Sequence, residues 1–91
     1  MTRRVTRVPP DGRRAIILRS TIDDFLTLSD VDRMVKSRLK RADPDPSIDR
    51  LKTRAALKDL QRAQLVARTP YGWRCTGAGQ AVLEASSEHR A

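Results

Sequence analysis

All five prolines of this 91-residue chain lie in three short clusters, which limit where helices can run. The clusters are Pro9-Pro10, Asp43-Pro44-Asp45-Pro46 and Pro70-Tyr71-Gly72. Proline lacks a backbone donor and disfavours helical geometry in the residue before it, so each cluster marks a break. The chain is therefore expected to hold helices on both sides of residues 42–47 and a turn near residue 71.

The composition predicts one small domain with an aliphatic core and a polyanionic partner. A chain of this length suits one domain, and its only aromatic residues are Phe25, Tyr71 and Trp73. Lysine and arginine total 19 against 11 acidic residues, which gives a formal charge of +8. Most of these cations are arginine, whose guanidinium suits bidentate contact with phosphate and guanine. The charge favours nucleic acid, although a solvated basic surface without a partner gives the same count.

Two helices are expected before the central proline cluster. Apolar residues recur every three or four positions in residues 13–26, as one face of a helix requires, and Asp11 is a candidate N-cap. A second helix is predicted over residues 30–41. Ser29 is its expected N-cap, and Asp32 follows three residues later as in a capping box.

A third helix is predicted over residues 48–63. Either Asp45 caps it with Pro46 at its first position, or Ser47 is the cap. Its apolar residues fall on two sides, one with Thr53, Leu57 and Leu60, the other with Ile48, Leu51 and Ala55. The first side is expected to pack on the first helix. The second side is expected to meet the second helix, the linker or another subunit.

The remainder of the chain predicts a β-hairpin and a short last helix. Strands are expected at residues 65–69 and 73–76, followed by a helix over residues 77–85 capped by Thr76. Residues 1–12 are expected to form a basic flexible arm, residues 13–85 the domain and residues 86–91 a frayed tail. The expected fold is therefore mainly α with a small β-hairpin, in the order helix, helix, helix, hairpin, helix.

Two segments resemble the winged helix-turn-helix regulators of the MarR-like and PadR-like families. Residues 57–66 resemble the L-x-x-L-x-x-x-G-L-V end of the recognition helix, and residues 73–83 resemble the Y-x-L-T-x-x-G-x-x-x-L segment after the wing. Gln64 stands where those families usually have glycine. The third helix must therefore be capped by a residue that has a side chain, and a positive φ at Gln64 is one way to form that cap. Cys75 stands where leucine is usual and is expected to act as a small buried hydrophobe.

The resemblance implies a DNA-binding protein, a small transcriptional regulator, whose third helix enters the major groove of double-stranded DNA. The hairpin would then be the wing, lying on the backbone or in the minor groove. The residues expected to contact DNA are Arg50, Lys52, Arg54 and Lys58 in the third helix, Arg68, Tyr71 and Arg74 in the wing, and Ser29 and Arg33 at the second helix. The N-terminal arm could also lie along DNA.

No catalytic, cofactor or metal site is expected, and the protein is not expected to be an enzyme. The only histidine, His89, lies in the expected tail, and the only cysteine, Cys75, has no histidine near it in sequence. No apolar run approaches the roughly 20 residues of a membrane helix. A cytoplasmic location and no membrane partner are therefore expected.

The sequence leaves another class of function open. Winged helices also serve as protein–protein interaction modules, so the chain could be a partner subunit or a phage or host regulatory factor that does not read DNA. Single-stranded RNA is a weaker alternative, because its readers usually expose several stacking aromatics. A weak homodimer is expected through the first helix, the terminal segments, or Ile48 and Leu51.

Overall fold

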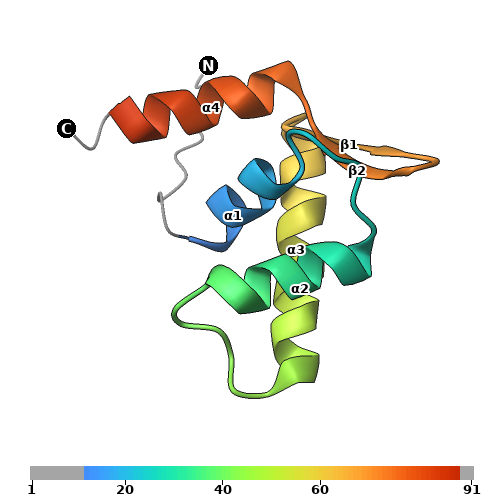
Figure 1. The fold of residues 1–91 in the computed structure, drawn as a ribbon, viewed down its shortest axis with the longest axis vertical. Helices are drawn as coiled ribbons and strands as arrows, with labels where there is room; N and C mark the ends of the chain where they lie inside the picture. The colour runs from blue at the N-terminus through green and yellow to red at the C-terminus, as the bar shows by residue number, and fades with distance from the viewer. Residues whose placement is uncertain (1–11, 89–91) are drawn as a thin grey trace.

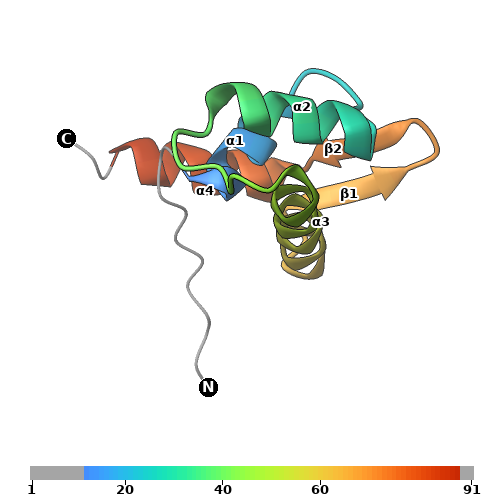
Figure 2. The same ribbon diagram turned by 90° about the horizontal axis from the view of Figure 1, so that it is seen from below.

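The computed structural model describes residues 12–88, which form four helices and one antiparallel two-stranded hairpin. The elements are α1 (Arg13–Ser20), α2 (Leu28–Arg38), α3 (Pro46–Arg62), β1 (Val66–Thr69), β2 (Gly72–Cys75) and α4 (Gly77–Glu88). The expected class, mainly α with a small hairpin, is confirmed. Figure 1 shows α2 crossing α3, and Figure 2 shows the hairpin projecting to one side of the helices. Residues 1–11 of the expected arm lie outside the described residues.

Helix α1 is the centre of the core and is shorter than expected. Its residues Ala15 to Leu18 are all buried, because α1 packs against α2, α3, α4 and β2. Four consecutive buried residues point to every side of a helix in turn, so α1 shows no single apolar stripe, although Arg14 and Arg19 remain exposed. The predicted helix over residues 13–26 is therefore wrong beyond Ser20. The buried Thr21 ends it, with its hydroxyl donating to the carbonyl of Ile17 at 2.9 Å.

The segment after α1 runs beside the hairpin. Leu26 and Trp73 exchange two backbone hydrogen bonds, at 3.0 and 2.7 Å, so residue 26 extends the sheet on the side of β2. Residues 21–24 form a turn and bends before this pairing, and α2 begins at Leu28, directly after Thr27. The capping box consists of Thr27 and Asp30 rather than the expected Ser29 and Asp32, and α2 begins at Leu28 and ends at Arg38. Helix α1 begins at Arg13 as predicted, although its N-cap is Gly12 and not the candidate Asp11.

Helix α3 agrees with the first of its two predicted starts. Asp45 is the N-cap, its carboxylate accepting from the amide of Ser47 at 2.9 Å, and Pro46 occupies the first position. The predicted inner side is correct, since Thr53, Leu57 and Leu60 are all buried. The opposite apolar side, by contrast, remains largely exposed.

The end of α3 and the hairpin follow the sequence closely. Gln64 has a φ of 64°, the left-handed geometry expected of a residue that stands at a usual glycine position. The hairpin pairs Val66 with Cys75, and both side chains are buried. Thr76 caps α4 by accepting from the amide of Gly79 at 3.0 Å. Helix α4 continues to Glu88, so residues 86–88 belong to the helix and not to the expected frayed tail, whose remaining residues 89–91 lie outside the described residues.

Candidate nucleic-acid interface

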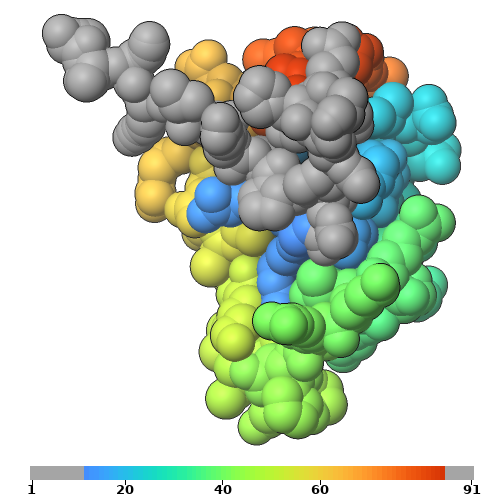
Figure 3. Space-filling view, turned by 90° about the vertical axis from the view of Figure 1, so that its left-hand side faces the viewer, coloured from blue at the N-terminus to red at the C-terminus, as the bar shows by residue number. Residues whose placement is uncertain are grey.

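The start of α3 projects from the body of the molecule. The first half of α3 extends below its crossing with α2 (Figure 1), and with the preceding loop it forms the lowest part of the space-filling view (Figure 3). Residues 39–45 form this loop, which is longer than the three or four residues of a compact helix-turn-helix connection. A helix end that projects in this way can approach a large partner without obstruction from the other helices.

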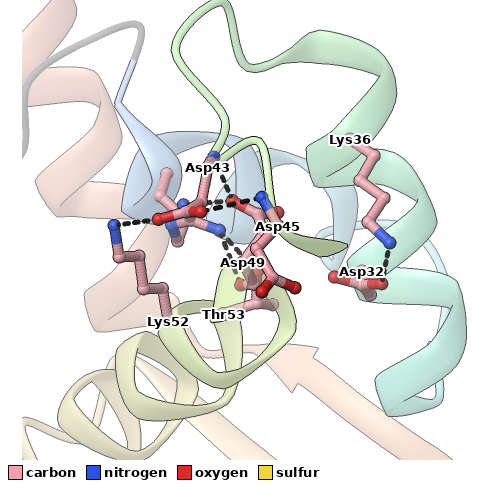
Figure 4. A network of polar contacts seen from close by, with 8 residues as sticks. Asp32, Lys36, Asp43, Asp45, Asp49, Lys52 and Thr53 are labelled. Carbon is pink, nitrogen blue, oxygen red and sulfur yellow. Dashed lines mark hydrogen bonds and ion pairs between the residues drawn. The ribbon is translucent and has the colours of Figure 1, made fainter. Parts of the chain in front are cut away.

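An internal ion pair holds the projecting helix against α1. The guanidinium of Arg13 lies 2.7 Å from the Asp49 carboxylate and donates to Thr53 Oγ1 at 2.7 Å. Asp49 also accepts from the backbone amide of Asp43 at 2.9 Å, so one buried carboxylate joins α1, the loop and α3. Figure 4 shows the carboxylates of this network gathered at the start of α3. The hydrogen bond from Arg13 lowers the pKa of Asp49 below its ordinary value, although burial acts in the opposite direction.

One of the residues predicted to contact DNA, Lys52, forms an ion pair with Asp43 in the loop before α3. Lys52 donates to Asp43 at 3.0 Å. The pKa of Asp43 is lowered, first by the backbone amide of Asp45 and then by Lys52. Residues two apart on an α-helix point about 200° apart, so Lys52 lies on the far side of α3 from Arg50 and Arg54. The structure therefore separates Lys52 from the other α3 candidates.

Three of the predicted α3 residues do share one side. Arg50, Arg54 and Lys58 follow one another at four-residue spacing, all three are exposed, and we call them the basic face of α3. Among the described side chains, those of residues 12–85, no carboxylate forms an ion pair with any of the three. The basic face therefore keeps its full positive charge available to a partner.

The start of α2 borders the basic face. The hydroxyl of Ser29 accepts a hydrogen bond from Arg50 at 3.2 Å, which joins the two helices where they cross. Arg33 is exposed one turn further along α2 and lies 3.6 Å from the Asp30 carboxylate. An exposed pair at this distance is weak, so the Arg33 guanidinium can exchange Asp30 for another anion.

An open cleft of about 400 Å³ lies between α2 and the start of α3. Its lining residues are Leu28 and Lys36 from α2, and Pro46, Ser47, Arg50, Leu51 and Arg54 from α3. Sequence reasoning did not include Lys36 or the cleft, because the approach of two helix surfaces leaves no local signal in the sequence. Leu51 belongs to the apolar side that was expected to meet another element, yet it is 60% exposed.

The hairpin candidates divide between two faces. Arg68 pairs in register with Trp73, and its guanidinium lies 5.9 Å from the Trp73 ring centre. Arg74 belongs to the neighbouring pair and therefore points to the other face, where it lies 5.0 Å from the Phe25 ring centre. Tyr71, at the turn, is 74% exposed with its ring 5.6 Å from Phe25. The structure thus separates Arg68 from Arg74.

Phe25 is the residue of this surface that sequence reasoning missed. It was expected on the buried face of the first helix, whereas it is part of the extended segment beside β2 and is 40% exposed. The apolar spacing that placed it in a helix is real, but the pairing of Leu26 with Trp73 decides the backbone conformation there. No signal in the local sequence distinguishes the two outcomes.

The comparisons with known proteins add no family to this geometry. No model of a protein family, no curated protein and no solved structure matches the chain significantly. In the described part, no helix combines the length and apolar composition needed to cross a membrane. Residues 12–88 likewise contain no group of three or more histidine, cysteine, aspartate or glutamate side chains that could hold a metal ion. Cys75 is buried, and burial raises the pKa of its thiol, which disfavours the reactive thiolate.

Proposed function

We propose that this protein is a winged helix-turn-helix protein that binds double-stranded DNA and acts as a small transcriptional regulator. The observation that carries the proposal is the basic face of α3, three cations in a row on a projecting helix without an acidic partner among the side chains of residues 12–85. An α-helix fits the major groove, where arginine can read guanine and where phosphates line both edges. In this proposal α3 is the recognition helix.

The arrangement of the elements supports the winged helix assignment. Helix α2 crosses α3 as the first helix of a helix-turn-helix crosses the second, and the hairpin follows α3 directly (Figure 1). The residue between α1 and α2 that pairs with the hairpin, Leu26, adds a third short strand position. The resemblance of residues 57–66 and 73–83 to MarR-like and PadR-like regulators points in the same direction.

Polar groups on either side of the basic face of α3 support double-stranded DNA as the partner. Ser29 and Arg33 lie at the start of α2, where a hydroxyl, a guanidinium and free helix amides can bind a backbone phosphate. The hairpin projects to one side of the helices (Figure 2), where a wing can reach backbone or minor groove. Tyr71 at its turn is exposed, and Arg68 and Arg74 offer a guanidinium on each of its two faces. Lys52 is left out of the proposed surface, because it faces away and is paired with Asp43.

The test is a titration of random 30-base-pair duplex DNA, followed by fluorescence anisotropy at two salt concentrations. We expect micromolar or tighter binding that weakens steeply with salt, as the release of condensed counterions requires. The variant Arg50→Ala/Arg54→Ala is expected to bind at least about tenfold more weakly and to lower the slope of the salt dependence by roughly two.

The matched control is Arg14→Ala/Lys52→Ala, which removes the same charge away from the basic face: Arg14 of α1 pairs with Asp59, and Lys52 of α3 pairs with Asp43. It should bind DNA nearly as the unchanged protein does. Equal losses in the two double variants would mean that net charge alone attracts DNA. Absence of binding at low salt would overturn the proposal.

A protein partner is the second candidate, and one observation favours it. Ile48 and Leu51 are 44% and 60% exposed on the projecting end of α3, and exposed large apolar side chains on neighbouring turns are typical of interaction surfaces. In that case α3 would dock on another protein and the basic face would be a solvated surface. Failure of the DNA titration would move this candidate to first place.

A further inference from the structure

Leu51 occupies the most outward position of the projecting part of α3. Thr53, two residues later, is fully buried against α1, and residues two apart on a helix point about 200° apart. The Leu51 side chain therefore points away from the core, and 60% of it is exposed. A leucine in this position loses apolar burial unless a partner covers it.

The surroundings of Leu51 define what that partner must offer. Leu51 lines the same cleft as Arg50 and Arg54, so its apolar surface lies beside guanidinium groups that no carboxylate of the described side chains neutralises. The partner must place an apolar group beside negative charge. In the major groove of DNA, phosphates border base edges that are polar with one exception, the 5-methyl group of thymine.

We infer that Leu51 contacts a thymine methyl group, and that the sites preferred by this protein carry thymine where the first turns of α3 enter the groove. This inference rests on the proposed DNA-binding function and specifies which base the apolar part of the surface selects. Arg50 and Arg54, on the adjacent side of the helix, then contact guanine or phosphate next to that thymine. Specificity comes from an apolar contact and charged contacts supplied by the same two helical turns.

The experiment begins with duplexes that the unchanged protein selects from a random-sequence library. Each thymine of a selected duplex is then replaced by uracil, which pairs identically and lacks only the 5-methyl group. We expect replacement at one position to weaken binding about fourfold, the equivalent of one buried methyl group. The Leu51→Ala variant should bind the thymine duplex more weakly and show little further loss with uracil at that position.

Ile48→Ala is the matched control, because it also truncates an exposed apolar side chain in the first turns of α3 but does not line the cleft. It should retain the preference for thymine over uracil. Selected sites without thymine, or equal affinity for thymine and uracil duplexes, would overturn the inference while leaving DNA binding intact. An unchanged preference in Leu51→Ala would also overturn it. No selection of DNA at all would remove the proposed function as well.

Discussion

The guanidinium of Arg13, the first residue of α1, lies 2.7 Å from the carboxylate of Asp49, a buried residue in the first turn of α3. Arg13 also donates to the backbone carbonyl of Asp49 at 3.2 Å and to the hydroxyl of Thr53 at 2.7 Å. One arginine thus bonds to three acceptors within two turns of α3. These contacts hold the projecting helix against the first residue of α1, 36 positions earlier in the chain.

Replacing this carboxylate should destabilise the fold. In Asp49→Asn the charge of Arg13 loses its buried partner, and Arg13 itself is only 15% exposed. We expect a loss of about 2–3 kcal/mol in the free energy of unfolding, below the roughly 3–5 kcal/mol typical of a fully buried pair, since water can reach Arg13. Urea denaturation measures the difference. A loss below about 0.5 kcal/mol would show that the pair contributes no more than an exposed one.

The same pair predicts a sensitivity to acid. The pKa of Asp49 is lowered in the folded protein, chiefly by Arg13, from an ordinary value of 3.8. A carboxyl group whose pKa falls on folding contributes stability above its unfolded pKa, and this contribution disappears as pH falls through the folded value. The stability difference between the unchanged protein and Asp49→Asn should therefore be full at about pH 6 and shrink below about pH 4. Urea denaturation at both pH values tests this, and a constant difference contradicts it.

Gln64 offers a stabilising substitution. Its φ of 64° costs a residue with a side chain roughly 1 kcal/mol or more, and glycine adopts this geometry freely. Because glycine also loses more entropy on folding, we expect Gln64→Gly to raise the free energy of unfolding by about 0.5–1 kcal/mol. The control Gln64→Ala removes the same side chain but keeps the strain, so it should give no gain. Thermal denaturation distinguishes the two variants. If both are more stable than the unchanged protein, the effect comes from removing the side chain and not from relieving backbone strain.

Two glycines of α4 should respond oppositely to the same change. A Cβ at Gly79 would collide with the carbonyl oxygen of Leu65 and would lie 2.7 Å from Cys75 Sγ, whereas at Gly77 nothing lies within 4 Å. Gly79→Ala is expected to lower the free energy of unfolding by about 1–3 kcal/mol through overpacking. Gly77→Ala should be neutral or slightly stabilising, because alanine favours helix. Urea denaturation of both variants checks this, and equal effects would contradict the close packing at Gly79.

Two lysines of α3 test the side of the helix that faces DNA. Lys58 belongs to the basic face, and Lys52 is paired with Asp43 on the opposite side. Each change to alanine removes one charge from the same helix. Lys58→Ala should weaken binding to random duplex DNA and lower the salt slope by about one, while Lys52→Ala should change neither appreciably. Anisotropy titrations at several salt concentrations give the slopes, and the reverse order would place DNA on the other side of α3.

Most elements of the fold were predictable from local signals. The Asp45-Pro46 start of α3, its buried Thr53, Leu57 and Leu60, and the hairpin turn at Pro70 to Gly72 all follow from the sequence. So does the left-handed geometry of Gln64. These features depend on neighbouring residues alone, through caps, helical spacing and turn geometry.

The length of α1 and the start of α2 were not predictable in this way. Residues 22–26 have helical apolar spacing, but residues 22–24 form bends and Leu26 pairs with Trp73, 47 positions away in sequence, so the helix does not continue through them. In the helix that remains, four consecutive residues, Ala15 to Leu18, are buried, so its pattern has no single stripe to mark where it ends. Tertiary pairing outweighs local preference here, because two backbone hydrogen bonds and the burial around them act together.

The sequence by itself determined that three cations share one side of α3, since four-residue spacing is enough to align Arg50, Arg54 and Lys58. Only the tertiary structure decided which cations remain available. The loop that carries Asp43 pairs with Lys52, and the sheet register places Arg68 and Arg74 on opposite faces of the hairpin. The physical reason is that spacing sets the direction of a side chain from its own helix or strand. Whether a carboxylate, a ring or solvent lies in that direction depends on segments that are distant in sequence.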